Sequence, residues 1–249
     1  MRIDLSLFSA SLFDMDGVVT DTVDAHRAAW KRLFDEYLRE WSSRHGRPFD
    51  PFDADRDYHQ FIDGKPRYDG VESFLSSRGI SLPRGEKEDP AGTETIYGLG
   101  NQKEGYFVEW LSKNRVRAYP GTLWFIKSLK EKGARIAVFS SSRNATAVLN
   151  SAGVLDLFDA KVDGEDLDRQ HLPGKPDPAI VLEASRRLGV APPHAVVVED
   201  AISGVEAGVR GRFGLVIGID RGHNREGLLK AGANLVVGDL IELKEGDAR

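Results

Sequence analysis

The sequence predicts an α/β fold: a doubly wound, mainly parallel Rossmann-like sheet core with an inserted α-helical domain. Short apolar runs alternate with amphipathic helical patterns bounded by Gly and Pro, which is typical of such a sheet. Several of these runs end directly in polar residues, as strands do when they open onto a ligand site. Roughly a hundred residues separate the first run from the second, far more than a crossover connection needs.

Five apolar runs are the predicted strands of the sheet. They cover residues 10–13, 136–139, 195–198, 215–219 and 235–237. Asp14, Ser140 and the pair Glu199 and Asp200 directly follow three of them. Because ligands bind at the carboxyl ends of the strands in open α/β sheets, we expect these side chains to meet in one site.

The long insertion is predicted to be a second, mainly helical domain. Apolar side chains recur at i, i+3 and i+4 in three stretches. These are Trp30, Leu33, Phe34, Tyr37, Leu38 and Trp41; Val71, Phe74 and Leu75; and Ile96, Leu99, Tyr106, Phe107, Trp110 and Leu111. Residues 44–57 and 81–92 are rich in Pro, Gly and charged residues and are predicted to be loops. Pro120 and Gly121 are predicted to begin the helix that returns to the core.

We expect a core of residues 1–22 and 118–249 and an insert of residues 23–117.

Composition limits the classes of partner. The 249-residue chain has 41% hydrophobic and 29% charged residues, an ordinary balance for a globular protein. Its net charge of −5 argues against a nucleic-acid-binding surface, which would be basic. Without cysteine it can form neither disulfides nor thiolate metal sites. No run approaches the ~18 apolar residues of a membrane span, and the N-terminus does not fit a signal peptide. We expect a cytoplasmic monomer that acts on a small molecule.

Asp14 and Asp16 form the most informative local pattern. On an extended backbone their side chains point to the same side, and Gly17 allows a tight turn directly after them. Two such carboxylates can hold a divalent cation, and one can attack a phosphoryl group. The alternatives are a surface strand that ends in acidic turn residues and a Ca²⁺ loop. A Ca²⁺ loop counted from Asp14 would have Ala25 at its twelfth position, where Glu is required.

Three further motifs follow the aspartate pair along the chain. With residues 14–22 they make an ordered series that continues at residues 140–144, 174–178 and 199–205. The series resembles the motifs of the haloacid dehalogenase superfamily of phosphoryl-transfer enzymes, and within it the β-phosphoglucomutase-like branch. The resemblance covers essentially the whole chain.

The resemblance implies a role for four polar side chains of the core. Asp14 would be the nucleophile that forms an aspartyl phosphate, and Asp16 would be the general acid and base. Ser140 would hydrogen-bond the transferring phosphoryl group. Lys175 would contact Asp14 and a phosphoryl oxygen, whereas a lone lysine is ordinarily a solvated surface charge.

The resemblance also implies a Mg²⁺ cofactor and a phosphate-binding helix end. The metal ligands would be Asp14, Asp16, Glu199 and Asp200, with Asp16 contributing its backbone carbonyl. Asp200 would bind the metal directly, and Glu199 directly or through water. Ser141 to Asn144 would start a helix whose free N–H groups attract an anion. Substrate-binding residues in this segment would be Ser142, Arg143 and Asn144.

For the insert, the resemblance implies a cap that closes over the active site, with hinges near Thr22 and Ala118. Arg67 would grip the phosphate that is not being transferred. Thr22, His26 and Lys103 match further binding positions at the hinge and in the cap. For His26 the alternative is a packed or exposed histidine, and for Lys103 it is a solvated helix lysine.

The function that the resemblance implies is a phosphosugar mutase. It would interconvert β-D-glucose 1-phosphate and glucose 6-phosphate through an aspartyl-phosphate enzyme and a bisphosphate intermediate. The nearest alternative is a Mg²⁺-dependent phosphatase acting on sugar phosphates or related small phosphomonoesters, which needs the same core residues. An alternative of another class is a non-catalytic phosphoacceptor or metabolite-binding regulator. Asp16 argues against that class, because a stable phosphoacceptor would do better without an acid and base beside it.

Overall fold

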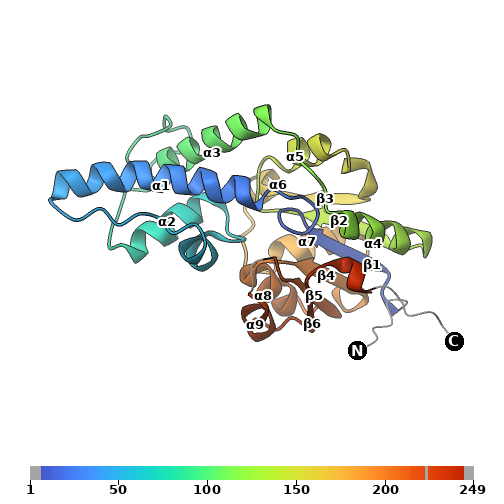
Figure 1. The fold of residues 1–249 in the computed structure, drawn as a ribbon. Coiled ribbons are helices and arrows are strands. Elements are labelled where there is room, and N and C mark those ends of the chain that lie inside the picture. The colour runs from blue at the N-terminus through green and yellow to red at the C-terminus, as the bar shows by residue number, and fades with distance from the viewer. Residues whose placement is uncertain (1–6, 222–223, 244–249) are drawn as a thin grey trace. The chain divides into compact units, whose positions relative to one another are not determined.

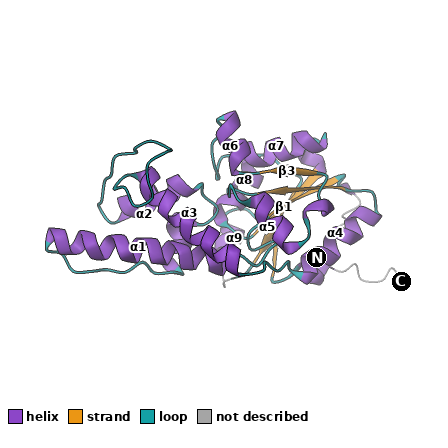
Figure 2. Cartoon of the chain, turned by 90° about the horizontal axis from the view of Figure 1, so that it is seen from above, coloured by secondary structure: helices purple, strands orange, loops and turns teal. Residues whose placement is uncertain are grey.

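The computed structural model describes residues 7–221 and 224–243 (Figure 1). The chain divides into two compact units. One comprises Met1–Asp21 and Val116–Arg249, and the other comprises Thr22–Arg115. The strands all belong to the first unit, and the described elements of the second are helices (Figure 2).

A parallel sheet forms the centre of the first unit, as the sequence predicts. In chain order its strands are β1 Ala10–Asp14, β2 Arg135–Phe139, β3 Ala160–Val162, β4 Ala195–Glu199, β5 Leu215–Ile219 and β6 Leu235–Val237. Their spatial order is β3-β2-β1-β4-β5-β6, and all neighbours run parallel. The chain winds outward from β1 in both directions, so the sheet is doubly wound and its strand order reverses beside β1.

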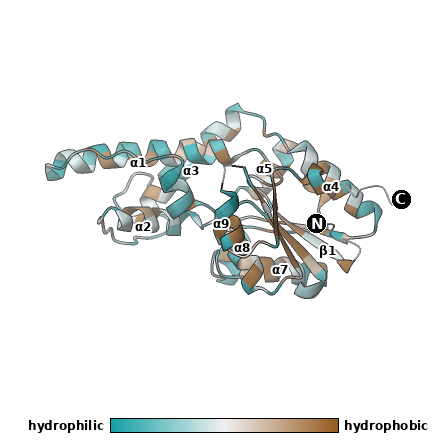
Figure 3. Ribbon diagram, turned by 60° about the horizontal axis from the view of Figure 1, so that its bottom comes forward, coloured by the Kyte–Doolittle hydropathy of each residue, from teal (hydrophilic) through white to brown (hydrophobic). Residues whose placement is uncertain are grey.

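Helices cover both faces of the sheet. They are α4 Pro120–Glu131, α5 Ala145–Ala152, α6 Gly164–Gln170, α7 Ala179–Leu188, α8 Ile202–Arg210 and α9 Arg225–Lys230. Short 3₁₀ turns lie at η3 Leu155–Leu157, η4 Pro192–His194 and η5 Leu240–Leu243. Because crossovers between parallel strands are right-handed, connections that wind in opposite directions place their helices on opposite faces. Figure 3 shows α4 and α5 on one side of the strands and α7 and α8 on the other.

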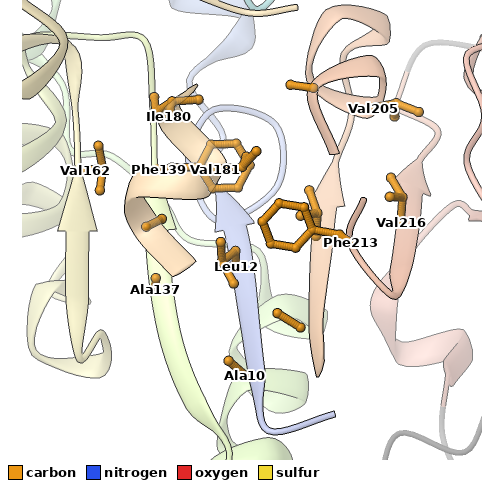
Figure 4. Close-up of a cluster of buried hydrophobic side chains, with 14 of the residues drawn as sticks. Ala10, Leu12, Ala137, Phe139, Val162, Ile180, Val181, Val205, Phe213 and Val216 are labelled. Atoms are coloured by element: carbon orange, nitrogen blue, oxygen red, sulfur yellow. The ribbon is translucent and has the colours of Figure 1, made fainter. Parts of the chain in front are cut away.

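An apolar cluster of this unit lies between the sheet and α6 to α9. Alternate strand residues such as Leu12, Phe139 and Val216 point into it, where they meet Ile180 and Val205 from the helices (Figure 4). The intervening strand residues face α4, as the edge-to-face contact of Phe13 with Phe125 shows. A sheet buried on both faces reads as continuous apolar runs, which is why the sequence predicts these strands.

The second unit is built from α1 Val23–His45, the π-helix η2 Tyr58–Ile62, α2 Arg67–Ser77 and α3 Ile96–Lys113. Its core is aromatic: Phe34 packs on Phe52 and Phe74 with ring centroids 5.2 and 4.1 Å away. Gly46 caps the C-terminus of α1 in the left-handed conformation, with a φ of 62°. Thr95 caps the N-terminus of α3, where its hydroxyl accepts a hydrogen bond from the Gly98 amide at 2.9 Å.

The five predicted strands and the three apolar helical stretches are confirmed. β3, which has three residues with Lys161 at its centre, was not predicted from the sequence. The helix expected from Ser141 onward begins only at Ala145 as α5, because residues 140–144 form a hydrogen-bonded turn. Among the described residues, no helix has both the length and the apolarity needed to cross a membrane.

Candidate active site

Polar side chains gather at the carboxyl ends of three adjacent strands. Asp14 is the last residue of β1, Glu199 is the last residue of β4, and Ser140 directly follows β2. β1 lies between β2 and β4, so these residues meet where the strand order reverses. This is the position at which open α/β sheets bind ligands.

Lys175 reaches this point from the loop between α6 and α7. Its ammonium lies 2.5 Å from Asp14 Oδ1 and 2.5 Å from Glu199 Oε1. The side chain is almost fully buried and lies over the Phe139 ring, with Nζ 4.8 Å from the ring centroid. Lys175 is therefore a fixed internal cation between two carboxylates and not a solvated surface charge.

Burial and charge shift the pKa values of Asp14 and Lys175. Burial raises the pKa of Asp14 well above its usual value; Lys175 opposes this shift, while Glu199 and Asp16 add to it. Burial alone would lower the pKa of Lys175, but the carboxylates of Asp14 and Glu199 outweigh it and raise that pKa. Lys175 is thus protonated at neutral pH, and it is a single cation between two acidic side chains.

Asp14, Glu199 and Asp200 together form a carboxylate cluster. One oxygen from each lies within 4.8 Å of the others. Carboxylate oxygens in a buried place suit a small divalent cation, which would oppose the effects of burial and of the neighbouring acidic groups that raise the pKa of Asp14. Glu199 already accepts hydrogen bonds from Lys175 and from the Ala201 amide at 2.8 Å. The cluster therefore fits a divalent metal.

Asp16 lies outside this carboxylate cluster. Its Oδ2 accepts a hydrogen bond from the Ser140 hydroxyl at 3.3 Å. The Ser140 hydroxyl in turn accepts a hydrogen bond from the Ser142 amide at 3.0 Å. Ser142 Oγ accepts one from the Asn144 amide at 3.2 Å. The Arg143 guanidinium lies 3.5 Å from Asp168. The structure thus brings Ser140 to Asp16, while Arg143 is engaged at the surface.

Two further features of this site were not predicted from the sequence. A Cβ at Gly204, in α8, would lie 1.7 Å from Glu199 Oε1. Its missing side chain therefore leaves room for the carboxylate of Glu199. Arg221, from beyond β5, donates a hydrogen bond to the Gly17 carbonyl at 2.8 Å. A contact between residues so far apart in the chain leaves no local sequence signal.

The remaining predicted binding residues lie in the second unit. Lys103 Nζ is 2.8 Å from His26 Nδ1, and the His26 ring stacks on Phe107 at 4.0 Å. Lys103 is buried, so the alternative of a solvated helix lysine does not hold. Arg67, the first residue of α2, forms an ion pair with Glu104 at 2.8 Å. Thr22 is also buried and precedes α1.

Comparisons with known proteins identify the family of the chain. Residues 8–211 match the family model for haloacid dehalogenase-like hydrolases. The chain is 45% identical over 237 residues to a β-phosphoglucomutase of Mycobacterium bovis, covering 94% of this chain and 90% of the relative. It is 30% identical to a phosphorylated carbohydrates phosphatase of Thermotoga maritima, covering 92% of this chain and 93% of that protein.

Solved structures show the same fold. A β-phosphoglucomutase structure from Clostridium difficile matches with a TM-score of 0.73 and 26% identity, covering 96% of this chain and 94% of that one. The chain belongs to the haloacid dehalogenase-like hydrolase family and is a phosphoryl-transfer enzyme.

Proposed function

We propose that this protein is a phosphosugar mutase that interconverts β-D-glucose 1-phosphate and glucose 6-phosphate through phospho-Asp14. The observation that carries the proposal is the Asp14 carboxylate, held 2.5 Å from a buried ammonium beside two further carboxylates. The name of the relative that is 45% identical supports the choice of substrate. A fixed nucleophile and a permanent cation are what in-line phosphoryl transfer requires.

The proposed reaction has two transfers that mirror each other. In the first, Asp16 takes the proton of the C6 hydroxyl of glucose 1-phosphate, the freed oxygen attacks the phosphorus of phospho-Asp14, and the bond from phosphorus to the Asp14 oxygen breaks, which gives the bisphosphate. In the second, the Asp14 oxygen attacks the phosphorus at C1, the bond from phosphorus to the C1 oxygen breaks, and Asp16 gives that oxygen its proton, which leaves glucose 6-phosphate and phospho-Asp14. Each transfer leaves Asp16 ready for the next, so no proton is lost over the cycle.

Other core side chains hold the phosphoryl group and the charge. Lys175 donates to a phosphoryl oxygen while keeping Asp14 in place, and Ser140 donates a further hydrogen bond. Asp14, Asp200 and the backbone carbonyl of Asp16 would hold Mg²⁺, with Glu199 directly or through water. Mg²⁺, when bound, reduces the repulsion between an anionic phosphate and the carboxylates.

The proposed role of the second unit is to bind the part of the substrate that does not react. A bisphosphate intermediate carries a second phosphate, and a planar guanidinium such as Arg67 matches its oxygens. In the structure Arg67 is the first residue of α2, and its guanidinium forms an ion pair with the Glu104 carboxylate. Thr22, His26 and Lys103 would complete the cap side of the site.

A second candidate function is a sugar-phosphate phosphatase, in which water attacks phospho-Asp14. The observation in its favour is the 30% identity to a phosphatase of phosphorylated carbohydrates. Both functions need the same core residues, so the core geometry alone does not separate them.

Product analysis separates the two functions. The enzyme is incubated with Mg²⁺ and β-glucose 1-phosphate, with and without glucose 1,6-bisphosphate, and the products are followed by ³¹P NMR. The mutase proposal predicts glucose 6-phosphate as the main product, with the bisphosphate raising the initial rate. Inorganic phosphate formed in step with substrate loss would overturn the mutase and select the phosphatase. α-Glucose 1-phosphate serves as the control for the anomer.

A further inference from the structure

Arg221 connects the end of β5 to the turn that follows β1. Its Nε donates to the Gly17 carbonyl at 2.8 Å, and its Nη1 donates to the Gly238 carbonyl at 3.2 Å. Nη1 also lies 3.7 Å from Asp239 Oδ2. The guanidinium thus joins segments that follow β1, β5 and β6, and all of these lie in the first unit.

Tyr119 supports the guanidinium from one side. The Arg221 guanidinium carbon lies 3.7 Å from the centroid of the Tyr119 ring, close enough for stacking. The Tyr119 hydroxyl donates to Asp21 at 3.1 Å, and its amide donates to the Val19 carbonyl at 3.0 Å. Burial, with added effects of Asp21 and Asp200, raises the pKa of Tyr119, so the phenol stays a neutral donor. The pair therefore clamps the segment in which the chain leaves and re-enters this unit.

The turn that Arg221 contacts carries Asp16. The Met15 carbonyl accepts the amides of Val19 and Thr20 at 2.9 and 2.8 Å, so the turn closes on itself. Gly17, with a φ of 81°, adopts the left-handed conformation that the turn requires. Arg221 binds the carbonyl of this glycine, one residue from Asp16. A shift of the Arg221 side chain would therefore shift the backbone of the turn that contains Asp16.

Stability alone does not explain an arginine at this place. Its Nη2 is buried and has no hydrogen-bond partner within residues 7–221 and 224–243. A buried donor without an acceptor opposes folding, and such groups in native proteins call for an explanation. A planar cation that stacks on one ring and donates hydrogen bonds to two carbonyls holds the backbone of these segments in position better than an apolar side chain would.

We propose that Arg221, stacked on Tyr119 and bonded to the Gly17 carbonyl, is a positioning residue that holds Asp16 where it can exchange a proton with the sugar oxygen. The inference rests on phosphoryl transfer through Asp14 with Asp16 as acid and base. It does not depend on the choice between mutase and phosphatase.

Leaving-group dependence in a single turnover tests this role. A sugar phosphate needs its leaving oxygen protonated, whereas p-nitrophenyl phosphate releases an aryl oxide that does not. Arg221→Met should slow phosphorylation of the enzyme by β-glucose 1-phosphate about 10- to 100-fold, the range for small misplacements of catalytic groups. The burst of p-nitrophenol should slow less than about threefold, because Asp14 is untouched. Arg225→Met, an exposed arginine on α9, is the control and should change neither rate.

Conservative variants separate positioning from folding. Arg221→Lys should recover part of the loss, since it keeps the charge without the planar stack. Tyr119→Leu should reproduce the selective loss, and combining it with Arg221→Met should add little, because the two act as one unit. Thermal unfolding of each variant shows whether it is folded at the assay temperature.

Asp16→Asn is measured beside these variants. If Asp16→Asn slows the sugar phosphate selectively while Arg221→Met slows both substrates equally or neither, the proposal for Arg221 is wrong and the role of Asp16 stands. If Asp16→Asn shows no selectivity, the acid and base assignment fails, and the inference that rests on it fails too. Selective loss in both variants supports both.

Discussion

Asp14 occupies a place in which an isolated carboxylate would be poorly tolerated. It is buried, and burial together with Glu199 and Asp16 raises its pKa. Lys175, 2.5 Å away, is the internal cation that offsets part of this cost. A nucleophile held in this way keeps little hydration to lose when a phosphate arrives, so its position is set before substrate binds.

Asp16 is the residue whose replacement tests the chemistry most selectively. Asp16→Asn keeps the size of the side chain and its contact with Ser140, but it cannot exchange a proton. We expect kcat to fall by roughly two to four orders of magnitude, with KM much less affected. Steady-state kinetics with β-glucose 1-phosphate measures this. A near-normal kcat with a raised KM would make Asp16 a structural acceptor. Asp156→Asn, an exposed aspartate of the same unit, is the matched control.

At the scale of elements, the approach of α8 to β4 shapes the acidic cluster. Gly204 stands in the first turns of α8, where a Cβ would lie 1.7 Å from Glu199 Oε1. A helix packed this closely leaves Glu199 one position, in which it accepts from Lys175 and from the Ala201 amide. The strand, the helix and the lysine loop thus fix the same carboxylate together.

Gly204→Ala should therefore disturb the metal site as well as the packing. The new methyl group must displace the carboxylate of Glu199, so we expect a higher Mg²⁺ concentration for half-maximal activity and a lower unfolding temperature. Mg²⁺ titrations of initial rate and thermal unfolding measure the two effects. An unchanged Mg²⁺ requirement would mean that Glu199 does not act in metal binding.

Gly105→Ala is the control for the helix effect of that substitution. Gly105 is an exposed position of α3, and a Cβ there has no neighbour within 4 Å. Alanine in a helix interior is favoured over glycine by roughly 0.5–1 kcal/mol. Gly105→Ala should therefore stabilise the protein slightly without changing its Mg²⁺ requirement.

The elements also show how far sequence could predict this structure. The strands read clearly because both faces of the sheet are buried, so that residues such as Val197 and Ile217 stand in unbroken apolar runs. β3 could not be predicted in this way, because its three residues have a lysine at the centre and form no apolar run. The start of α5 at Ala145 was also missed, since side-chain to backbone hydrogen bonds hold the preceding residues in a turn.

For the candidate site, sequence order predicted which residues gather but not what surrounds them. Asp14 and Glu199 lie together because they are the last residues of the neighbouring parallel strands β1 and β4. Neither the burial of Lys175 nor the room that Gly204 provides is visible locally, since each depends on packing between distant segments. The same holds for Arg221, which meets Gly17 from the opposite end of the chain.

At the scale of the whole molecule, metal binding should couple the active site to global stability. Asp14 binds protons more readily in the folded than in the unfolded chain, because its folded pKa is raised. Between the ordinary aspartate pKa, about 4, and the raised value, metal-free stability should fall as pH rises. Mg²⁺ needs the ionised carboxylate, so its stabilising effect should grow with pH.

Thermal unfolding at pH 5 and pH 8, with and without Mg²⁺, measures this coupling. We expect a larger Mg²⁺-induced rise in unfolding temperature at pH 8 than at pH 5. Asp14→Asn should remove most of that difference, and without metal at pH 8 it should unfold no lower than the wild type. A rise of equal size at both pH values, or one retained in Asp14→Asn, would place the metal elsewhere.

The second unit should determine which substrates are used. If Arg67 grips the distal phosphate of a bisphosphate, Arg67→Ala should cost about 1.5–3 kcal/mol in kcat/KM for glucose phosphates. Arg67→Lys should recover only part of it, because an ammonium lacks the planar fork. p-Nitrophenyl phosphate, with no second phosphate, should be little affected. Kinetics of both variants on both substrates measure this.

Arg84→Ala is the control for Arg67 within the same unit, since Arg84 is half-exposed and pairs with Glu72 at 3.0 Å. It should leave both substrates unchanged. Equal losses on both substrates in Arg67→Ala would mean that Arg67 acts through stability. No loss on either would remove the distal-phosphate role.

The central claim, phosphoryl transfer through Asp14, is tested most directly by trapping the phosphoenzyme. The protein is mixed with Mg²⁺ and glucose 1,6-bisphosphate, quenched in acid, and reduced with borohydride, which converts an aspartyl phosphate to homoserine. Peptide mass spectrometry should then find homoserine at position 14 in the wild type, and none in Asp14→Asn, which should not turn over. A label at another residue, or a tenth or more of wild-type activity in Asp14→Asn, would contradict the account.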